Sequence, residues 1–205
     1  MSARNDRWME PWLPRMRAAA GDGPLLELGC DVGGDTAWLC EQGFDVVGGD
    51  IEMPALRYCA GGAPGARLLQ FDLRRPLPFI DGAFGVVVAS LCLHYFDWTT
   101  TERAVAEVHR CLEPGGLLLF RANSVRDVNH GADAGVEIEP GLRRVHGTYS
   151  EEKRFFDQPD LERLFARGSW TWLSCRETTI ARYVAPKVAW ELALLRSPST
   201  TQASA

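Results

Sequence analysis

The residues best suited to chemistry form a glycine-rich turn that follows a short apolar segment near the start of the chain. Residues 24–28 are Pro-Leu-Leu-Glu-Leu, and the turn after them contains Gly29, Gly33 and Gly34. Because glycine has no Cβ, the backbone of such a turn can bend tightly and come close to a ligand. Two ligand classes use a turn of this kind between a strand and a helix: dinucleotides and S-adenosylmethionine.

The acid at position 31 distinguishes these two ligand classes. The dinucleotide pattern G-x-G-x-x-G would place Asp31 at its middle glycine, where the carboxylate would face a pyrophosphate. Two like charges about 4 Å apart repel by about 4 kcal/mol at an effective dielectric constant of about 20. The same negative charge is compatible with the sulfonium and ammonium groups of S-adenosylmethionine. The turn therefore favours S-adenosylmethionine and disfavours NAD or FAD.

The elements around this turn indicate an α/β fold. From residue 24 to about 120, short β-branched runs alternate with helical segments, as expected of βαβ units and a parallel sheet. Asp157 precedes a further helix as a capping residue. We predict strands at 24–28, 44–48, 66–71, 84–90, 117–120, 170–177 and 188–195, and helices at 33–42, 53–60 and 100–111.

The rest of the chain supports a simple domain organisation. Residues 1–22 are predicted to contain a covering helix, and residues 23–196 a single domain. Residues 122–150 are polar and weakly periodic, which is typical of an inserted loop or lid. The Ser- and Thr-rich residues 197–205 are predicted to be a disordered tail.

Four segments in order resemble the class I S-adenosylmethionine-dependent methyltransferases of the small bacterial type, from about Trp12 to Leu195. The family's acidic glycine-rich pattern corresponds to Glu27, Gly29, Asp31 and Gly33, with Asp31 in place of a glycine. The others are Asp50 after the second strand, Asp72 after the third, and the Leu-Glu-Pro-Gly-Gly turn at 112–116. Gly85 departs from the family, which has Asp at this position of the fourth strand.

The resemblance implies a fold and a set of ligand-binding residues. The fold is a doubly wound, seven-stranded, mostly parallel sheet of order 3-2-1-4-5-7-6 with the last strand antiparallel. The implied cofactor is S-adenosyl-L-methionine, with Asp50 at the ribose hydroxyls and Asp72 near the adenine amino group. The expected cofactor-binding residues are Glu27, Gly29, Cys30, Asp31, Gly33, Asp50, Ile51, Asp72, Leu73 and Ser90.

The segment after the fourth strand faces the reactive end of the cofactor in this fold, and here it contains His94 and Tyr95. His94 could accept a proton and Tyr95 could orient a methyl acceptor, so these are the candidate catalytic residues. The alternative is that both side chains only cap the strand and pack under the next helix. Four residues after the fifth strand could line the acceptor pocket or simply form turns: Asn123, Asp127, Asn129 and His130.

The composition of the chain disfavours several classes of partner. The net charge of −5 disfavours a nucleic-acid partner, and the [N/D]-P-P-[Y/F] signature of planar-amine methylation is absent. The six cysteines lack C-x-x-C spacing, so no metal site is predicted. No apolar run reaches the roughly 20 residues of a membrane span, and we expect a cytoplasmic protein.

The sequence therefore predicts a methyltransferase that acts on a small-molecule oxygen, sulfur or nitrogen nucleophile. Two alternatives stay open. One is a non-catalytic member of the fold that binds the cofactor or a partner, and the other, which Asp31 disfavours, is a nicotinamide-dependent oxidoreductase. The oligomeric state is not predicted.

Overall fold

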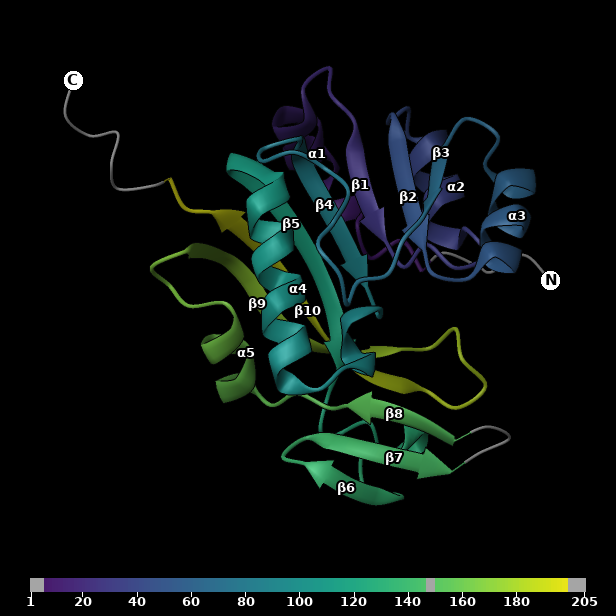
Figure 1. The fold of residues 1–205 in the computed structure, drawn as a ribbon, viewed down its shortest axis with the longest axis vertical. Helices are drawn as coiled ribbons and strands as arrows, with labels where there is room; N and C mark the ends of the chain where they lie inside the picture. Colours follow the sequence, from purple (N-terminus) through teal and green to yellow (C-terminus); the bar gives the residue numbers. More distant parts are fainter. Residues whose placement is uncertain (1–5, 147–149, 199–205) are drawn as a thin grey trace.

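The structure, a computed structural model, describes residues 6–146 and 150–198 (Figure 1). Parts of three sequence-based predictions lie outside the described residues. These parts are residues 1–5 of the covering segment, 147–149 of the insert and 199–205 of the tail.

The core of the fold is a seven-stranded sheet of order β3-β2-β1-β4-β5-β10-β9. Strand β10 runs antiparallel to both of its neighbours, whereas the pairs among β1 to β5 are parallel. In chain order this is 3-2-1-4-5-7-6 with the last strand antiparallel, which confirms the predicted topology. The strands are β1 (Leu25–Leu28), β2 (Val46–Asp50), β3 (Arg67–Gln70), β4 (Phe84–Ser90), β5 (Leu112–Asn123), β9 (Trp170–Ile180) and β10 (Lys187–Arg196).

Helices cover both faces of this sheet (Figure 1). Alternate residues of β4 enter two separate cores, since side chains alternate across a strand. Val86 and Val88 pack with α1 and α2, whereas Val87 and Ala89 pack with α4 and α5. The helices are α1 (Leu13–Ala20), α2 (Gly34–Glu41), α3 (Met53–Gly62), α4 (Trp98–Cys111) and α5 (Gln158–Leu164), with short 3-10 turns η1 (Glu10–Trp12), η2 (Leu93–Tyr95) and η3 (Val128–His130).

Gly85 stands where the resembled family has Asp, and close packing explains the glycine. A Cβ at Gly85 would lie 1.8 Å from the carbonyl oxygen of Ala19, at the end of α1. Any side chain would therefore push α1 away from the sheet. Opposite Gly85 the register shifts, because Leu112 pairs with Phe84 whereas Leu117 pairs with Val86. The predicted turn at 113–116 is thus a bulge within β5.

The predicted insert is more ordered than its sequence pattern indicates. Part of it, with the residues that follow, forms a second, antiparallel sheet of β6 (Val136–Glu139), β7 (Leu142–His146) and β8 (Ser150–Arg154). A polar contact holds this sheet to the domain, because the buried guanidinium of Arg154 pairs with Glu139 and donates to the Phe96 carbonyl at 3.1 Å. The loop prediction is wrong for these strands, and a role as a lid stays a prediction.

Within residues 6–146 and 150–198, no helix is long and apolar enough to cross a bilayer. The same residues contain no group of three or more His, Cys, Asp or Glu side chains arranged to hold a metal ion.

Candidate active site

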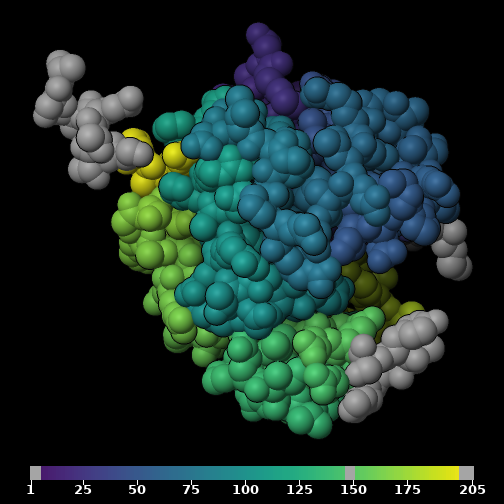
Figure 2. Space-filling view, viewed as in Figure 1, coloured from purple at the N-terminus to yellow at the C-terminus, as the bar shows by residue number. Residues whose placement is uncertain are grey.

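A cavity of about 1310 Å³ opens where the parallel strands end. Ligand pockets for one drug-sized molecule have roughly 300–1,000 Å³, so this cavity has room for a cofactor and a second molecule. Figure 2 shows a recess between the blue residues of the first half of the chain and the green three-stranded sheet. Every predicted site residue except Gly33 lines it: Glu27, Gly29, Cys30, Asp31, Asp50, Ile51, Asp72, Leu73, Ser90, His94 and Tyr95.

Two glycines of the turn after β1 are required by close packing. Gly29 has a φ of 63°, and a Cβ there would lie 2.3 Å from the Cβ of Cys92. Gly33 has a φ of 84°, and its Cβ would lie 2.5 Å from the Sγ of Cys59 in α3. Because both positions combine a left-handed backbone with a blocked Cβ, no other residue fits without a shift. The turn is fixed between β4 and α3 with its backbone at the cavity wall.

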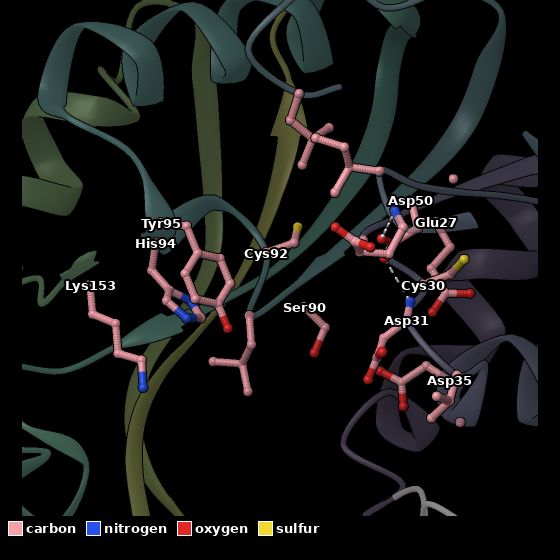
Figure 3. Close-up of a pocket in the computed structure, with 18 of the residues that line it drawn as sticks. Glu27, Cys30, Asp31, Asp35, Asp50, Ser90, Cys92, His94, Tyr95 and Lys153 are labelled. Carbon is pink, nitrogen blue, oxygen red and sulfur yellow. Dashed lines mark hydrogen bonds between the residues drawn. The ribbon is translucent and has the colours of Figure 1, made fainter. Parts of the chain in front are cut away.

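Asp50 connects this turn to the end of β2. Its Oδ2 accepts a hydrogen bond from the Asp31 amide at 2.9 Å, and its Oδ1 accepts one from the Glu52 amide at 2.9 Å (Figure 3). Asp31 has a φ of 46°, a left-handed conformation that Asp tolerates better than most residues. Burial, with the nearby Asp50 charge, raises the pKa of the Asp31 carboxyl.

Glu27 is a buried acid at the base of the cavity. Only 3% of its surface is exposed, and its Oε2 accepts a hydrogen bond from the Thr36 hydroxyl at 2.7 Å. Burial raises the pKa of Glu27 well above its usual range, and the Asp35 carboxylate adds to this effect. A cationic group in the cavity would reverse the shift, since an opposite charge favours the ionised carboxylate.

Asp72 lies at the far end of the same wall. Arg74 holds it, since the guanidinium Nε donates to both carboxylate oxygens at 2.9 and 3.0 Å. These hydrogen bonds lower the pKa of Asp72. Ile51, which follows Asp50, accepts a hydrogen bond from the Gln70 side chain at 2.8 Å through its carbonyl, and its side chain is exposed at the cavity.

The two candidate catalytic residues form η2 on the other side of Ser90. Only 2% of His94 is exposed, and its Nδ1 has no hydrogen-bond partner among the described residues. Burial lowers the pKa of His94 well below its usual range, helped by Lys187 and Lys153, so the imidazole is neutral. The rings of His94 and Tyr95 have centroids 4.2 Å apart. Burial raises the pKa of Tyr95 to about 12.

Known proteins with a similar sequence or fold include methyltransferases. Residues 26–120, which contain the turn, Asp50 and η2, match the sequence model of the methyltransferase domain family. This part of the chain is similar to the methyltransferase domain, as the resemblance in the sequence implies. An uncharacterized methyltransferase of Synechocystis is 36% identical over 93 residues, which are 45% of this chain and 43% of that protein. A ribosomal RNA small subunit methyltransferase C of Alcanivorax borkumensis is 31% identical over 109 residues, 49% of this chain and 32% of that protein.

The chain spans less than half the length of the curated relatives it matches. Solved structures agree on the fold over most of the chain. An S-adenosylmethionine-dependent methyltransferase of Methanosarcina mazei has a TM-score of 0.78 at 18% identity, covering 91% of this chain and 98% of that one. The 1,6-didemethyltoxoflavin-N1-methyltransferase of Burkholderia thailandensis, solved with 1,6-didemethyltoxoflavin and S-adenosylhomocysteine, has a TM-score of 0.67 at 19% identity, covering 95% and 80%.

Of the four residues predicted as either acceptor-pocket or turn residues, one lines the cavity. That residue is His130, whose Nδ1 is 2.9 Å from Asp127. Asp127 is fully buried behind the wall, Asn123 is buried within β5, and Asn129 donates to the Pro186 carbonyl at 2.8 Å. These three residues have structural roles.

The wall opposite the turn contains residues that the sequence analysis did not select. Lys153 comes from β8, and Arg182, Tyr183 and Lys187 come from the β9–β10 hairpin. One topological signal could have found the hairpin residues. Because β10 is antiparallel to β5, its first residues lie at the edge where the parallel strands end.

Proposed function

We propose that this chain binds S-adenosylmethionine and transfers its methyl group to a small-molecule oxygen, sulfur or nitrogen nucleophile. The observation that carries the proposal is the cofactor-side wall, where the glycine turn and the acids that follow β1, β2 and β3 open into one large cavity. The space left beyond η2 is where an acceptor would lie.

The residues of this wall fit the cofactor. The close packing of Gly29 on Cys92 and of Gly33 on Cys59 fixes the turn, and Gly29 lines the cavity. Asp50 uses each carboxylate oxygen for one amide, and each oxygen retains a lone pair for a ribose hydroxyl. Glu27 is a buried acid that a cationic ligand would stabilise in its ionised form. We assign the methionine end to Glu27, with Asp31 nearby but not an essential ligand, the ribose to Asp50, and the adenine to Asp72 with Ile51 and Leu73.

When bound, S-adenosylmethionine supplies a methyl group on a cationic sulfur. The chain's own contribution is to hold a nucleophile in line with that methyl group, and exact placement of reactants supplies several kcal/mol of barrier lowering. Tyr95 is neutral at physiological pH and can donate a hydrogen bond to an acceptor. His94 is neutral but a weak base, because burial opposes its protonation. We therefore assign both residues to positioning.

Two observations support a small acceptor over RNA. The net charge is −5, and the cofactor-side wall is acidic, so a polyanion is repelled. The far side of the cavity is lined by Lys153 of β8 and by the β9–β10 hairpin, which suits a small molecule. Against this stands the similarity to a ribosomal RNA methyltransferase, which makes RNA the second candidate.

A labelled-methyl assay separates these candidates. The purified chain is incubated with methyl-labelled S-adenosylmethionine and either the ultrafiltered small molecules or the purified RNA of a cell extract. The proposal predicts label in the small-molecule fraction. Label in RNA alone would replace a small-molecule acceptor with RNA, and no transfer to either fraction despite cofactor binding would support the non-catalytic alternative.

A further inference from the structure

Both lysines of the chain lie on the same wall of the cavity. Lys153 and Lys187 are the only lysines among 22 basic Lys and Arg residues. Lys153 comes from β8 and Lys187 is the first residue of β10, and both line the cavity. Lysine presents a compact ammonium with three donors, whereas arginine presents a planar fork.

Four of the acids that line the cavity lie on a different side of it from its two lysines. The carboxylates of Glu27, Asp31, Asp35 and Asp50 gather on the side of the glycine turn (Figure 3). Lys153 lies on the other side of Ser90, beside His94 and Tyr95 (Figure 3). A cationic cofactor suits the acidic side, so the basic side is left for a ligand of negative charge.

The ammonium of Lys187 is held at the cavity by a buried carboxylate. Its Nζ donates to Asp127 Oδ2 at 2.8 Å, and Asp127 Oδ1 accepts from the Val188 amide at 2.9 Å. Asp127 is not part of the cavity lining and is fully buried. Burial lowers the pKa of Lys187, and the Asp127 carboxylate opposes this shift and so favours the charged ammonium. The other N–H donors of the ammonium stay available for a ligand.

Lys153 is arranged in a similar way. Its Nζ is 2.8 Å from Glu151, an exposed acid outside the cavity lining. Both ammonium groups contribute to lowering the pKa of His94, so both charges act on the segment that faces the reacting end. The two lysines therefore border the same space as η2.

Aromatic surfaces flank this space. The ring of Tyr95 is half exposed at the cavity. Tyr183 comes from the β9–β10 hairpin, its ring centroid is 5.9 Å from Lys187 Nζ, and it meets the ring of His130 edge-on at 5.6 Å. A planar molecule can pack against such rings while an anionic substituent reaches the ammonium groups.

We propose that the acceptor is a planar small molecule with an anionic carboxylate or phosphate group, which Lys153 and Lys187 bind while its ring packs against Tyr95 and Tyr183. This inference rests on the proposed function for the role of the ligand as acceptor, but the binding of the anion can be measured without methyl transfer.

The test uses three small probes of similar shape: benzoate, phenyl phosphate and the neutral benzamide. Each is titrated calorimetrically into the protein, with and without saturating S-adenosylhomocysteine. We expect at least one anion to bind about tenfold or more tightly than benzamide, the change expected for a charge-assisted hydrogen bond. The two anions distinguish a carboxylate-bearing from a phosphate-bearing acceptor.

Lys153→Gln is the main variant, because the exposed Glu151 tolerates loss of its partner, whereas Lys187→Gln would leave Asp127 buried and unpaired. It should weaken anion binding about tenfold. Lys153→Arg should restore much of it. Arg144→Gln is the matched control, since Arg144 pairs with Glu152 at 2.7 Å in the same small sheet but outside the cavity. It should leave binding unchanged.

Three results would overturn the proposal: benzamide binding as tightly as the anions, no anion binding at millimolar concentration, or equal losses in Lys153→Gln and Arg144→Gln. Failure of the proposed function is a separate outcome. It would appear as no binding of S-adenosylhomocysteine, while anion binding to the basic wall could still be observed.

Discussion

The backbone amide of Asp31 donates a 2.9 Å hydrogen bond to the carboxylate of Asp50, so the turn after β1 and the end of β2 form one unit. Asp50 therefore has two roles in this account: it would bind the ribose, and it keeps the turn in place. Because the hydrogen bond uses the amide of Asp31 and not its side chain, the two positions respond differently to substitution.

Asp31→Gly should retain or improve binding of the cofactor product S-adenosylhomocysteine. Asp31 has a φ of 46°, a conformation that glycine adopts without strain, and the amide that binds Asp50 is kept. The change also removes a carboxylate whose pKa is raised by burial. Calorimetry with S-adenosylhomocysteine measures the effect. Complete loss of binding would make the Asp31 side chain a direct ligand.

Gly33→Ala and Gly43→Ala form a matched pair. Both glycines have nearly the same φ, 84° and 83°, but only Gly33 has a neighbour, the Cys59 sulfur at 2.5 Å, in the way of a Cβ. Gly43→Ala should cost about 1–2 kcal/mol of unfolding free energy from strain alone and keep the cofactor site. Gly33→Ala should cost more and weaken cofactor binding. Denaturant unfolding and calorimetry test both, and equal effects would exclude a packing role for Gly33.

Glu27→Gln should stabilise the ligand-free protein at alkaline pH while weakening cofactor binding. The pKa of Glu27 is higher in the folded than in the unfolded protein, where it is about 4.3. The Glu27 side chain therefore contributes fully to stability below a pH of about 4.3, and this contribution is lost as the pH rises through the folded-state pKa. Gln stays neutral, and a gain of about 1 kcal/mol at pH of about 8 would raise Tm by roughly 2–4 °C. Thermal melts at several pH values test this, with the exposed Glu41→Gln as control. A lower Tm for Glu27→Gln at alkaline pH would contradict it.

His94→Ala should reduce methyl transfer by roughly tenfold or less, since a general base typically contributes about 10²–10⁴-fold. Because burial lowers the pKa of His94, the rate of the unmodified protein should not fall as pH decreases through about 6.5, the ordinary histidine value. His109→Ala removes a partly buried imidazole outside the cavity and controls for lost packing. A loss above about 10³-fold with cofactor affinity intact would make His94 the base.

The cofactor-side wall follows from the sequence because its residues end consecutive strands. The apolar run at 84–90 predicts β4 at its observed bounds, since a strand buried on both faces has no polar alternation. Asp50 is the last residue of β2 and Asp72 lies just after β3, and parallel strands bring their carboxyl ends to one edge. Local pattern and chain order together are sufficient for this half of the site.

The opposite wall does not follow from local pattern. Asp127 and Lys187 are 60 residues apart and meet only because β10 inserts beside β5. The sequence pattern also does not predict the β6–β7–β8 sheet, because apolar and polar residues alternate only weakly along its strands. Val136 and Ile138 are exposed, so few apolar residues of the sheet mark it as buried, and contacts such as that of Arg154 with the Phe96 carbonyl attach it to the domain.

The central claim, a cofactor site formed around Asp50, is tested most directly by calorimetric titration of S-adenosylhomocysteine into the unmodified protein, Asp50→Ala and the control Asp45→Ala. Asp45 is an exposed acid just before β2 that pairs with Arg67 at 2.6 Å, outside the cavity. The account predicts that Asp50→Ala weakens binding by about 1–3 kcal/mol, whereas Asp45→Ala has no effect. Equal affinity of all three proteins, or saturable binding of NADH with none of S-adenosylhomocysteine, would contradict it.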